Sequence, residues 1–246
     1  MVIAGLERCS FVDWPGRIAA VVFTPGCNFA CDYCHNRALL EVQPNAPGLS
    51  PEAFLAWLTS RQGLLDGVVF SGGEPTLQPD LADMIDAVRD LGFMVKLDTN
   101  GARPHTLRAL LSSGCLDFVA MDVKAPCNRY DEVCGRSVIQ RDIDASIEAI
   151  MSSGTAYEFR TTVLPAFDVE DIVSMAARIR GARRYVLQQY RPPKGSAAAS
   201  TADLRAARRP HDGATLAAMA QAAAAYVTRC EVRGAPIENV LAENAI

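Results

Sequence analysis

The sequence has no long apolar run, and this absence limits the class of protein. No stretch approaches the roughly 18 consecutive apolar residues that a membrane-spanning helix needs. The first residues, MVIAGLERCSFVDWPG, contain no apolar core of a signal peptide. We therefore expect a cytoplasmic protein with no membrane partner. Disulfides are rare in that compartment, so a tight group among the eight cysteines is expected to serve metal binding or catalysis.

Excess positive charge is also missing. The chain has 24 Lys and Arg residues against 28 Asp and Glu residues, which gives a formal net charge of −4. A protein that binds the phosphate backbone of nucleic acid over a broad surface needs an excess of positive charge, so we expect no nucleic-acid partner. The sequence also shows no phosphate-binding P-loop and no Ser-His-Asp arrangement.

What the chain does have is a regular alternation of strand and helix patterns. Each of six apolar, β-branched runs is followed by a segment of helical period, which predicts a parallel sheet with right-handed crossovers. We expect an α/β fold, an open partial (β/α)6 barrel, with a doubly wound sheet as the runner-up. The expected strands are 18–23, 67–70, 93–98, 117–122, 157–164 and 185–190.

The alternation weakens after the sixth strand. We expect residues 1–191 to form the partial barrel and 192–246 to form a C-terminal segment of the same domain. That segment begins with a Pro-, Ala- and Ser-rich stretch, which is typical of a mobile region or lid. A last helix at about 213–227 and a short strand in RCEVRG are expected to follow.

Polar and glycine-rich strings follow the predicted strands at their carboxyl ends. A cysteine-rich loop follows the first, and SGGEP (71–75) follows the second. DTNG (98–101), DVK (122–124) and QQYR (188–191) end later ones. Barrels and open α/β sheets build their sites at this edge. The adjacent glycines also allow backbone to approach a ligand closely. We therefore expect one site there.

Three cysteines in the spacing Cys27-x3-Cys31-x2-Cys34, followed by His35, allow three kinds of centre. Zinc could take all four side chains as a Cys3His site. A [4Fe–4S] cubane could take three thiolates and leave its fourth iron open to an amino and a carboxylate group of a small molecule. CDYCH also matches the attachment pattern of c-type haem, which normally accompanies export. The open cubane is the favoured interpretation.

These strings carry a family resemblance. Cys-x3-Cys-x-aromatic-Cys after a first strand, with GGEP after the second, resembles the radical S-adenosylmethionine superfamily. SFVDWPGRIAAVVFTPGCNFACDYCHN, SGGEPTLQ, VKLDTNG, VAMDVKAP and EFRTTVLP together resemble the activating enzymes of glycyl radical enzymes, in particular those of anaerobic ribonucleoside-triphosphate reductase. The resemblance covers residues 5–191.

The resemblance implies a set of site residues. Three cysteines would ligate a [4Fe–4S] cluster, and the other residues would contact S-adenosylmethionine. Two aspartates would flank this cofactor, and in relatives they help to hold a monovalent cation beside its carboxylate. Some relatives carry a histidine at the end of the sixth strand, where this chain has Arg191. The implied ligands are Cys27, Cys31 and Cys34, and the implied cofactor contacts are Tyr33, Gly72, Gly73, Glu74, Asp98, Thr99, Asp122, Lys124, Arg160 and Arg191.

The resemblance also implies an activity and partners. An electron from flavodoxin or ferredoxin would drive reductive cleavage of S-adenosylmethionine to a 5′-deoxyadenosyl radical, which would take a hydrogen atom from a glycine of a partner. The expected partner is a glycyl radical enzyme, with class III ribonucleotide reductase as the specific expectation. The alternatives are a radical enzyme that modifies a peptide or small molecule, and a non-catalytic zinc-binding protein. Five further cysteines are expected to be ordinary thiols: Cys9, Cys115, Cys127, Cys134 and Cys230.

Overall fold

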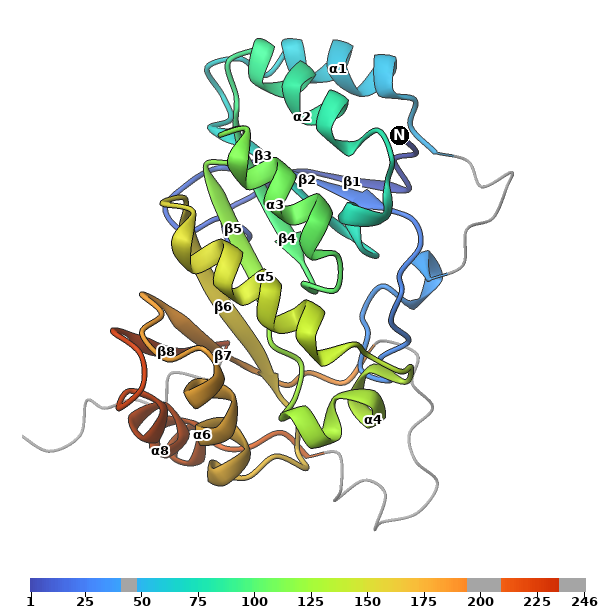
Figure 1. Ribbon diagram of the computed structural model, residues 1–246. Coiled ribbons are helices and arrows are strands. Elements are labelled where there is room, and N and C mark those ends of the chain that lie inside the picture. Colours follow the sequence, from blue (N-terminus) through green and yellow to red (C-terminus); the bar gives the residue numbers. More distant parts are fainter. Residues whose placement is uncertain (41–47, 194–208, 235–246) are drawn as a thin grey trace, which may run out of the picture.

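The computed structural model describes residues 1–40, 48–193 and 209–234. Its strands form one eight-stranded sheet in the order of the chain, β1 to β8 (Figure 1). β1 and β2 are antiparallel, and every later pair is parallel. The strands are β1 Gly5–Ser10, β2 Ala19–Thr24, β3 Gly67–Gly72, β4 Met94–Thr99, β5 Phe118–Asp122, β6 Ala156–Val163, β7 Tyr185–Gln189 and β8 Cys230–Arg233.

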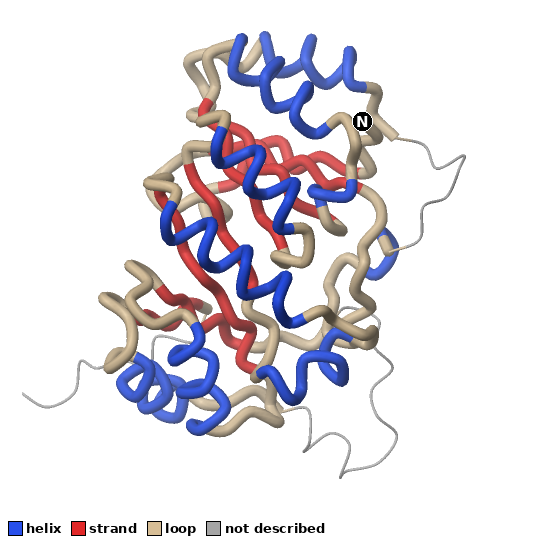
Figure 2. Tube along the Cα trace, in the orientation of Figure 1, coloured by secondary structure: helices blue, strands red, loops and turns tan. Residues whose placement is uncertain are grey.

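Helices follow one another along one side of the sheet (Figure 2). In α2 the buried residues Leu81, Met84, Ile85 and Val88 have the helical spacing that turns one face to the sheet. The longer helices are α1 Pro51–Thr59, α2 Leu81–Asp90, α3 Pro104–Ser112, α5 Gln140–Ser152, α6 Val169–Arg178 and α8 Gly213–Ala223. The shorter ones are α4 Tyr130–Cys134 and the 3-10 turns η1 Arg37–Leu39, η2 Pro75–Leu77 and η3 Cys127–Arg129.

The two faces of the sheet carry different side chains. Alternate residues of a strand point to opposite faces, so β2 sends Val22 into the large core under the helices and Val21 into a small apolar cluster on the other face. Trp14 caps that small cluster together with Val69. Further along this inner face the residues become charged, beginning with Lys96 of β4. The inner face of the sheet is therefore apolar around Trp14 and becomes charged toward Lys96.

The structure confirms the α/β class and the open partial barrel. The doubly wound alternative is wrong for the described part of the chain, because the strand order runs from β1 to β8 without a reversal point. The six expected strands correspond to β2–β7. The antiparallel edge strand β1 was not expected, because GLERCS shows no apolar run and three of its residues are exposed.

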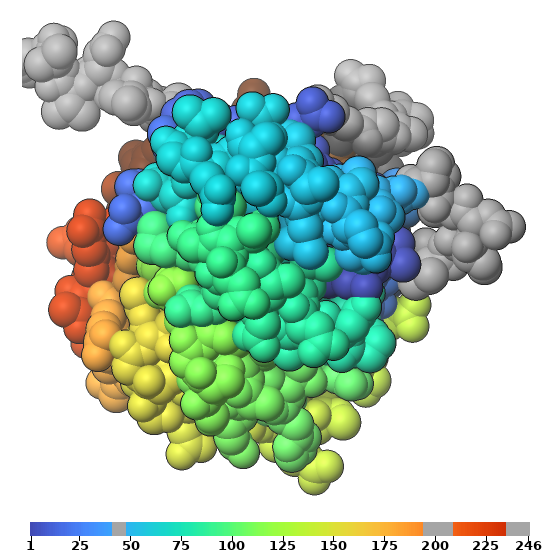
Figure 3. Space-filling view, turned by 90° about the horizontal axis from the view of Figure 1, so that it is seen from above, coloured from blue at the N-terminus to red at the C-terminus, as the bar shows by residue number. Residues whose placement is uncertain are grey.

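The C-terminal elements extend the same sheet. β8 pairs in parallel with β7, and α8 lies against α6. α8 ends at Ala223, four residues before the expected end of the last helix. The expected mobile stretch falls largely on residues 194–208, outside the described residues. Seen from the end at which α1 lies, α1 and α2 in cyan and green form the surface (Figure 3). Within the described residues no helix is long and apolar enough to span a membrane.

Candidate functional site

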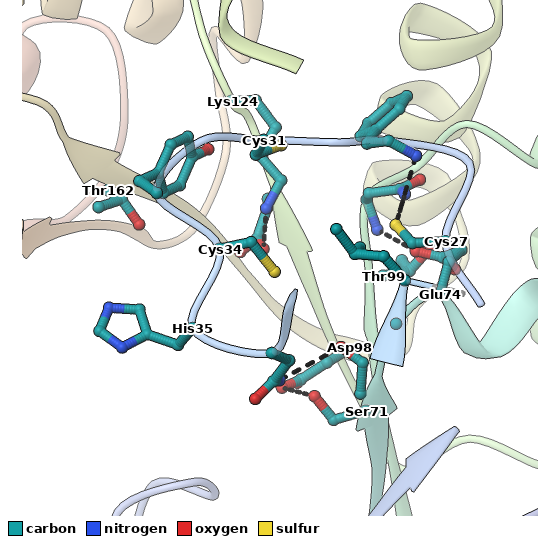
Figure 4. Close-up of a pocket in the computed structure, with 18 of the residues that line it drawn as sticks. Cys27, Cys31, Cys34, His35, Ser71, Glu74, Asp98, Thr99, Lys124 and Thr162 are labelled. Carbon is teal, nitrogen blue, oxygen red and sulfur yellow. Dashed lines mark hydrogen bonds and ion pairs between the residues drawn. The ribbon is translucent and has the colours of Figure 1, made fainter. Parts of the chain in front are cut away.

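A cavity opens at the carboxyl ends of β2–β6, and almost every residue expected at the site lines it (Figure 4). Arg191 is the exception. It lines a neighbouring cavity, which shares only His35 and Thr162 with the first. The expected residues that line the main cavity are Cys27, Cys31, Tyr33, Cys34, Gly72, Gly73, Glu74, Asp98, Thr99, Asp122, Lys124 and Arg160.

The cysteine loop, residues 24–36, is held by hydrogen bonds to its own backbone and to the next strands. The Phe29 amide donates to Cys27 Sγ at 3.4 Å. Asn100 Nδ2 donates to Asn28 Oδ1 at 2.8 Å and lies 3.8 Å from Cys27 Sγ. The Cys34 amide donates to the Cys31 carbonyl at 3.1 Å. These bonds place all three thiols along one wall of the cavity.

The glycine turn, residues 71–75, packs against the start of the cysteine loop. The Gly73 amide donates to the Thr24 carbonyl and the Glu74 amide to the Gly26 carbonyl, both at 2.8 Å. A Cβ atom on Gly73 would lie 1.9 Å from the Gly26 oxygen. Gly72 has a φ of 114°, which few other residues adopt. The close approach that these glycines permit is therefore to the protein's own loop.

Glu74 ties the glycine turn to β4 through its carboxylate. Its Oε1 accepts from the Thr76 hydroxyl at 2.5 Å and from the Thr99 hydroxyl at 2.8 Å, and its Oε2 accepts from the Asn100 amide at 2.7 Å. The side chain is buried, and burial raises the pKa of the carboxyl despite these donors. Glu74 therefore fixes the end of β4 relative to the turn.

The cavity also has a charge cluster of five residues: Asp98, Asp122, Lys124 and Arg160 line the cavity, and Lys96 supports Asp98 from behind the lining. Register places Arg160 of β6 directly beside Asp122 of β5. Arg160 Nε donates to Asp122 Oδ1 at 2.9 Å, and its Nη1 donates to Asp98 Oδ2 at 3.3 Å. Lys96 Nζ lies 2.6 Å from Asp98 Oδ1, and Lys124 Nζ lies 2.8 Å from Asp122 Oδ2.

Opposite charges set the protonation states in the charge cluster. Burial would raise the pKa of the Asp122 carboxyl, but the charges of Arg160 and Lys124 outweigh burial and hold this pKa well below its ordinary value. The pKa of the Asp98 carboxyl is also lowered, because the charges of Arg160 and Lys96 outweigh the effect of burial. Burial would lower the pKa of Lys124, but Asp122 raises it well above the ordinary value. Burial lowers the pKa of Lys96, and the charge of Asp98 partly offsets this. The other four residues of the cluster are therefore ionised at neutral pH.

The three cavity thiols do not share one environment. Burial raises the pKa of the Cys27 thiol to about 11. A hydrogen bond with the Cys134 thiol lowers the pKa of Cys31 to about 6. Cys134 ends α4, is fully buried, and accepts a backbone hydrogen bond from the Ala30 amide at 2.8 Å. The expectation of an ordinary thiol overlooked this contact with the cysteine loop.

The donor set can be tested against a single metal ion and against a cluster. His35 Nε2 donates to the Arg191 carbonyl at 3.1 Å, and the ring points away from the three thiols (Figure 4). No group of three or more His, Cys, Asp or Glu side chains in the described ranges gathers closely enough to hold a metal ion. In a cubane each thiolate binds a different iron, so the sulfurs need not converge on one point. The spread thiols fit a cluster better than zinc.

A buried hydroxyl also fits a missing ligand. The Tyr33 hydroxyl lies inside the cavity wall beside the Cys31 thiol, and within the described structure it has no nitrogen or oxygen partner for a hydrogen bond. Orphaned buried polar groups are rare, and each one calls for an explanation such as an absent ligand. The Lys124 ammonium lies 5.8 Å from the centre of the Tyr33 ring. The tyrosine therefore sits where the cysteine loop meets the charge cluster.

Besides Cys134, sequence reasoning missed Lys96 and several residues that line the cavity. Lys96 is fully buried and anchors Asp98, while its Nζ also donates to the Asp13 carbonyl at 2.7 Å. A lysine inside an apolar strand, two residues before a site aspartate, was an available signal. Ser71, Asn100 and Thr162 also line the cavity, but their strings predicted only turns and strand ends.

Comparison with known proteins assigns the family. Residues 21–179 match the family model described as the Radical SAM superfamily. A protein of Methanocaldococcus jannaschii, provisionally named a glycyl-radical enzyme activating enzyme, is 33% identical over 198 residues, which cover 78% of this chain and 80% of that protein. The pyruvate formate-lyase-activating enzyme of Clostridium pasteurianum is 28% identical over 199 residues, 76% of this chain and 81% of that enzyme.

The fold has a solved counterpart. The structure of Streptococcus suis SuiB bound to S-adenosylmethionine superposes with a TM-score of 0.58 at 14% identity, covering 87% of this chain and 48% of SuiB. This chain thus spans about half the length of that protein, and the likeness concerns the fold. Enzymes of the superfamily use a [4Fe–4S] cluster and S-adenosylmethionine, the cofactors expected from the sequence. The chain belongs to the radical SAM superfamily and, within it, to the glycyl-radical-enzyme activating enzymes.

Proposed function

We propose that this protein activates a glycyl radical enzyme, and that its cavity holds both cofactors. Cys27, Cys31 and Cys34 are the cluster ligands in this proposal. One observation carries it: three spread thiols, a glycine turn and a charge cluster meet in a single cavity at one edge of the sheet. When bound, the cluster and S-adenosylmethionine supply the radical chemistry.

The chain's own residues orient the cofactor in this proposal. The charge cluster carries three cations and two carboxylates, so it has one uncompensated positive charge for the methionyl carboxylate. Tyr33 offers its ring and its buried hydroxyl on the side of the cysteine loop. Gly72 and Gly73 keep that loop in register with β3. Together these groups would fix the reactive end of the cofactor and exclude water from it.

The substrate in this proposal is a backbone glycine in a loop of the partner. The open edge of the sheet leaves the second cavity beside the first, lined among others by Thr162, Gln188 and Arg191. Arg191 stands there in place of the histidine of some relatives, and we assign it to this neighbouring space rather than to S-adenosylmethionine. The partner we propose is a class III anaerobic ribonucleotide reductase. The two relatives support a glycyl radical enzyme in general.

The proposal includes an electron donor and a location. A reduced flavodoxin or ferredoxin would supply the electron in the cytoplasm. All eight cysteines are free thiols in the structure, as a reducing compartment requires. We also propose that residues 1–191 and 192–246 act as one domain. β8 supports this, because it is a strand of the same sheet.

The test is anaerobic reconstitution with iron and sulfide, followed by mixing with the reductase, S-adenosylmethionine and a reductant. We expect 5′-deoxyadenosine and a glycyl radical doublet in the electron paramagnetic resonance spectrum. Replacing the partner's radical glycine with alanine should remove the doublet and leave the protein's cluster signal intact.

Two other outcomes would redirect the proposal. A doublet on a different glycyl radical enzyme would keep the activity and replace the partner. Formation of 5′-deoxyadenosine with a modified peptide or metabolite, and no partner radical, would contradict the activase proposal and favour a modifying enzyme.

A further inference from the structure

We infer that this protein binds S-adenosylmethionine without a monovalent cation, because the Arg160 guanidinium holds the position between Asp98 and Asp122 that such a cation would need. The inference rests on the proposed cofactor cavity and assigns Arg160 as a positioning residue. The family resemblance implies a cation beside these two aspartates. The side chains of this chain do not fit one.

All four oxygens of the two carboxylates already accept from the protein. Asp98 Oδ1 accepts from Lys96 at 2.6 Å, and Asp98 Oδ2 accepts from the Ser71 hydroxyl and from Arg160, both at 3.3 Å. Asp122 Oδ1 accepts from Arg160 at 2.9 Å and Asp122 Oδ2 from Lys124 at 2.8 Å. A metal cation at this place needs oxygen ligands, so it would compete with Arg160 and the two lysines for the lone pairs of these oxygens and would lie close to their positive charges.

Charge balance also opposes an added cation. Lys96, Lys124 and Arg160 surround two carboxylates and leave one positive charge over. The methionyl carboxylate would neutralise that charge. A further cation at this place would instead face three others, and like charges at short range are costly in a partly buried site. Glu158, the nearest additional carboxylate on β6, is already bound by Arg184 and Arg233.

The geometry of Arg160 suits this role. The Arg160 side chain is 12% exposed, and from β6 its guanidinium reaches Asp98 at the end of β4 and Asp122 at the end of β5. A planar fork can bridge two carboxylates at fixed angles, which an ammonium or a hydrated ion cannot do in the same way. The bridge is thus a built-in substitute for the ion.

The experiment measures S-adenosylmethionine affinity of the reconstituted protein by calorimetry in sodium, potassium and choline chloride at equal ionic strength. We expect the wild-type dissociation constant to agree within about twofold in all three salts. Arg160→Gln should bind roughly tenfold more weakly in choline and should recover part of that loss in sodium or potassium, because a small ion can now enter. Arg160→Lys, which keeps the charge, should stay independent of the salt.

The matched control is Arg178→Gln. Arg178 is also a buried arginine in an ion pair, with Asp144, but it lies on α6 away from the cavity. It should reproduce the wild type in every salt. A merely structural effect of losing Arg160 would weaken binding equally in the three salts, and that result would overturn the inference.

A second measurement avoids S-adenosylmethionine and so separates this inference from the proposed function. The sodium NMR linewidth should be unaffected by the wild-type protein and broadened by Arg160→Gln. Broadening by the wild type would refute the inference, even if the cofactor bound elsewhere. Failure of the wild type to bind S-adenosylmethionine in any salt would instead contradict the proposed cavity.

Discussion

The two walls of the cavity are made of different material. Backbone forms the first wall, where the glycine turn and the cysteine loop exchange main-chain hydrogen bonds and leave no room for a Cβ atom at Gly73. Charged side chains form the second wall, where three basic groups hold Asp98 and Asp122. The backbone wall should be disrupted when side-chain atoms are added to it, whereas the charged wall should be destabilised when a charge is removed from it. Five predictions test these two modes of failure.

The largest effect is expected from the thiols of the first wall. Replacing Cys27, Cys31 or Cys34 with alanine removes a proposed cluster ligand, so the [4Fe–4S] absorption and all formation of 5′-deoxyadenosine should disappear. Iron and sulfide analysis after reconstitution checks this. Cys115→Ala is the control, because this buried thiol lies outside the cavity and should leave the cluster and turnover intact. A cluster that needs Cys115 would contradict the ligand assignment.

The next effect tests the backbone wall by adding atoms. Gly73→Val places a branched side chain where even a Cβ atom would meet the Gly26 oxygen at 1.9 Å. The residue before Cys27 must then move, so both iron content and S-adenosylmethionine affinity should fall. Gly114→Ala is the control for backbone conformation, because Gly114 has a φ of 71° but open space around it. It should lose stability and keep its iron. Normal iron content in Gly73→Val would mean that the turn does not support the loop.

A smaller effect is expected when a charge leaves the second wall. Asp122→Asn should lower the free energy of unfolding at pH 7 by about 2 kcal/mol, because Lys124 and Arg160 lose a partner in a mostly buried site. The iron content should not change. Asp144→Asn, which breaks the more exposed pair with Arg178, should cost less. Urea unfolding measures both variants.

The pH dependence of the same pair follows from the lowered pKa of Asp122. The ionised Asp122 carboxylate contributes fully to the free energy of unfolding above the unfolded-state pKa of about 3.9. This contribution is lost as the pH falls through the lower pKa of the folded state. The difference in the free energy of unfolding between the wild type and Asp122→Asn should therefore become smaller as the pH falls below about 4. A difference that stays constant down to pH 2 would exclude the ion pairs as its cause.

The smallest effect concerns two thiols of the same loop. In the iron-free protein at pH 7.5, the lower pKa of Cys31 leaves this thiol mostly as thiolate, the form that iodoacetamide alkylates, whereas the higher pKa of Cys27 leaves Cys27 protonated. Because Cys31 is the more buried of the two, its labelling rate is compared with and without Cys134. Cys134→Ala removes the thiol hydrogen bond, so the pKa of Cys31 should rise and its labelling should slow. Peptide mass spectrometry reads each site separately. Equal rates for Cys31 with and without Cys134 would rule out the contact.

The first wall was predictable from the sequence and the second only in part. The strands of the backbone wall are continuous apolar runs, and the three cysteines lie within eight residues, so local pattern was enough. The partnership of Arg160 with both aspartates depends on the register of β4, β5 and β6. The spacing of these residues along the chain does not predict that strand register. The nearness of Asp98 and Asp122 was inferred correctly, whereas the bridge that Arg160 forms between them was not predicted.

Two other differences have a similar cause. Cys134 reaches the cysteine loop from α4, about a hundred residues later in the chain, and no short motif connects the two. β1 is a strand because it pairs with β2 through a register set by Gly5 and Phe23, although its own residues are half exposed. In both cases tertiary contact decides a structure that local preference leaves open.

The unbroken strand order has a consequence for how the protein is made. Every residue that lines the main cavity lies between Cys27 and Thr162. Each strand from β2 onward pairs with the strand before it in the chain, so such a sheet can assemble in chain order as a ribosome delivers it. The walls of the cavity can therefore be in place while β7, α8 and β8 are still being synthesised.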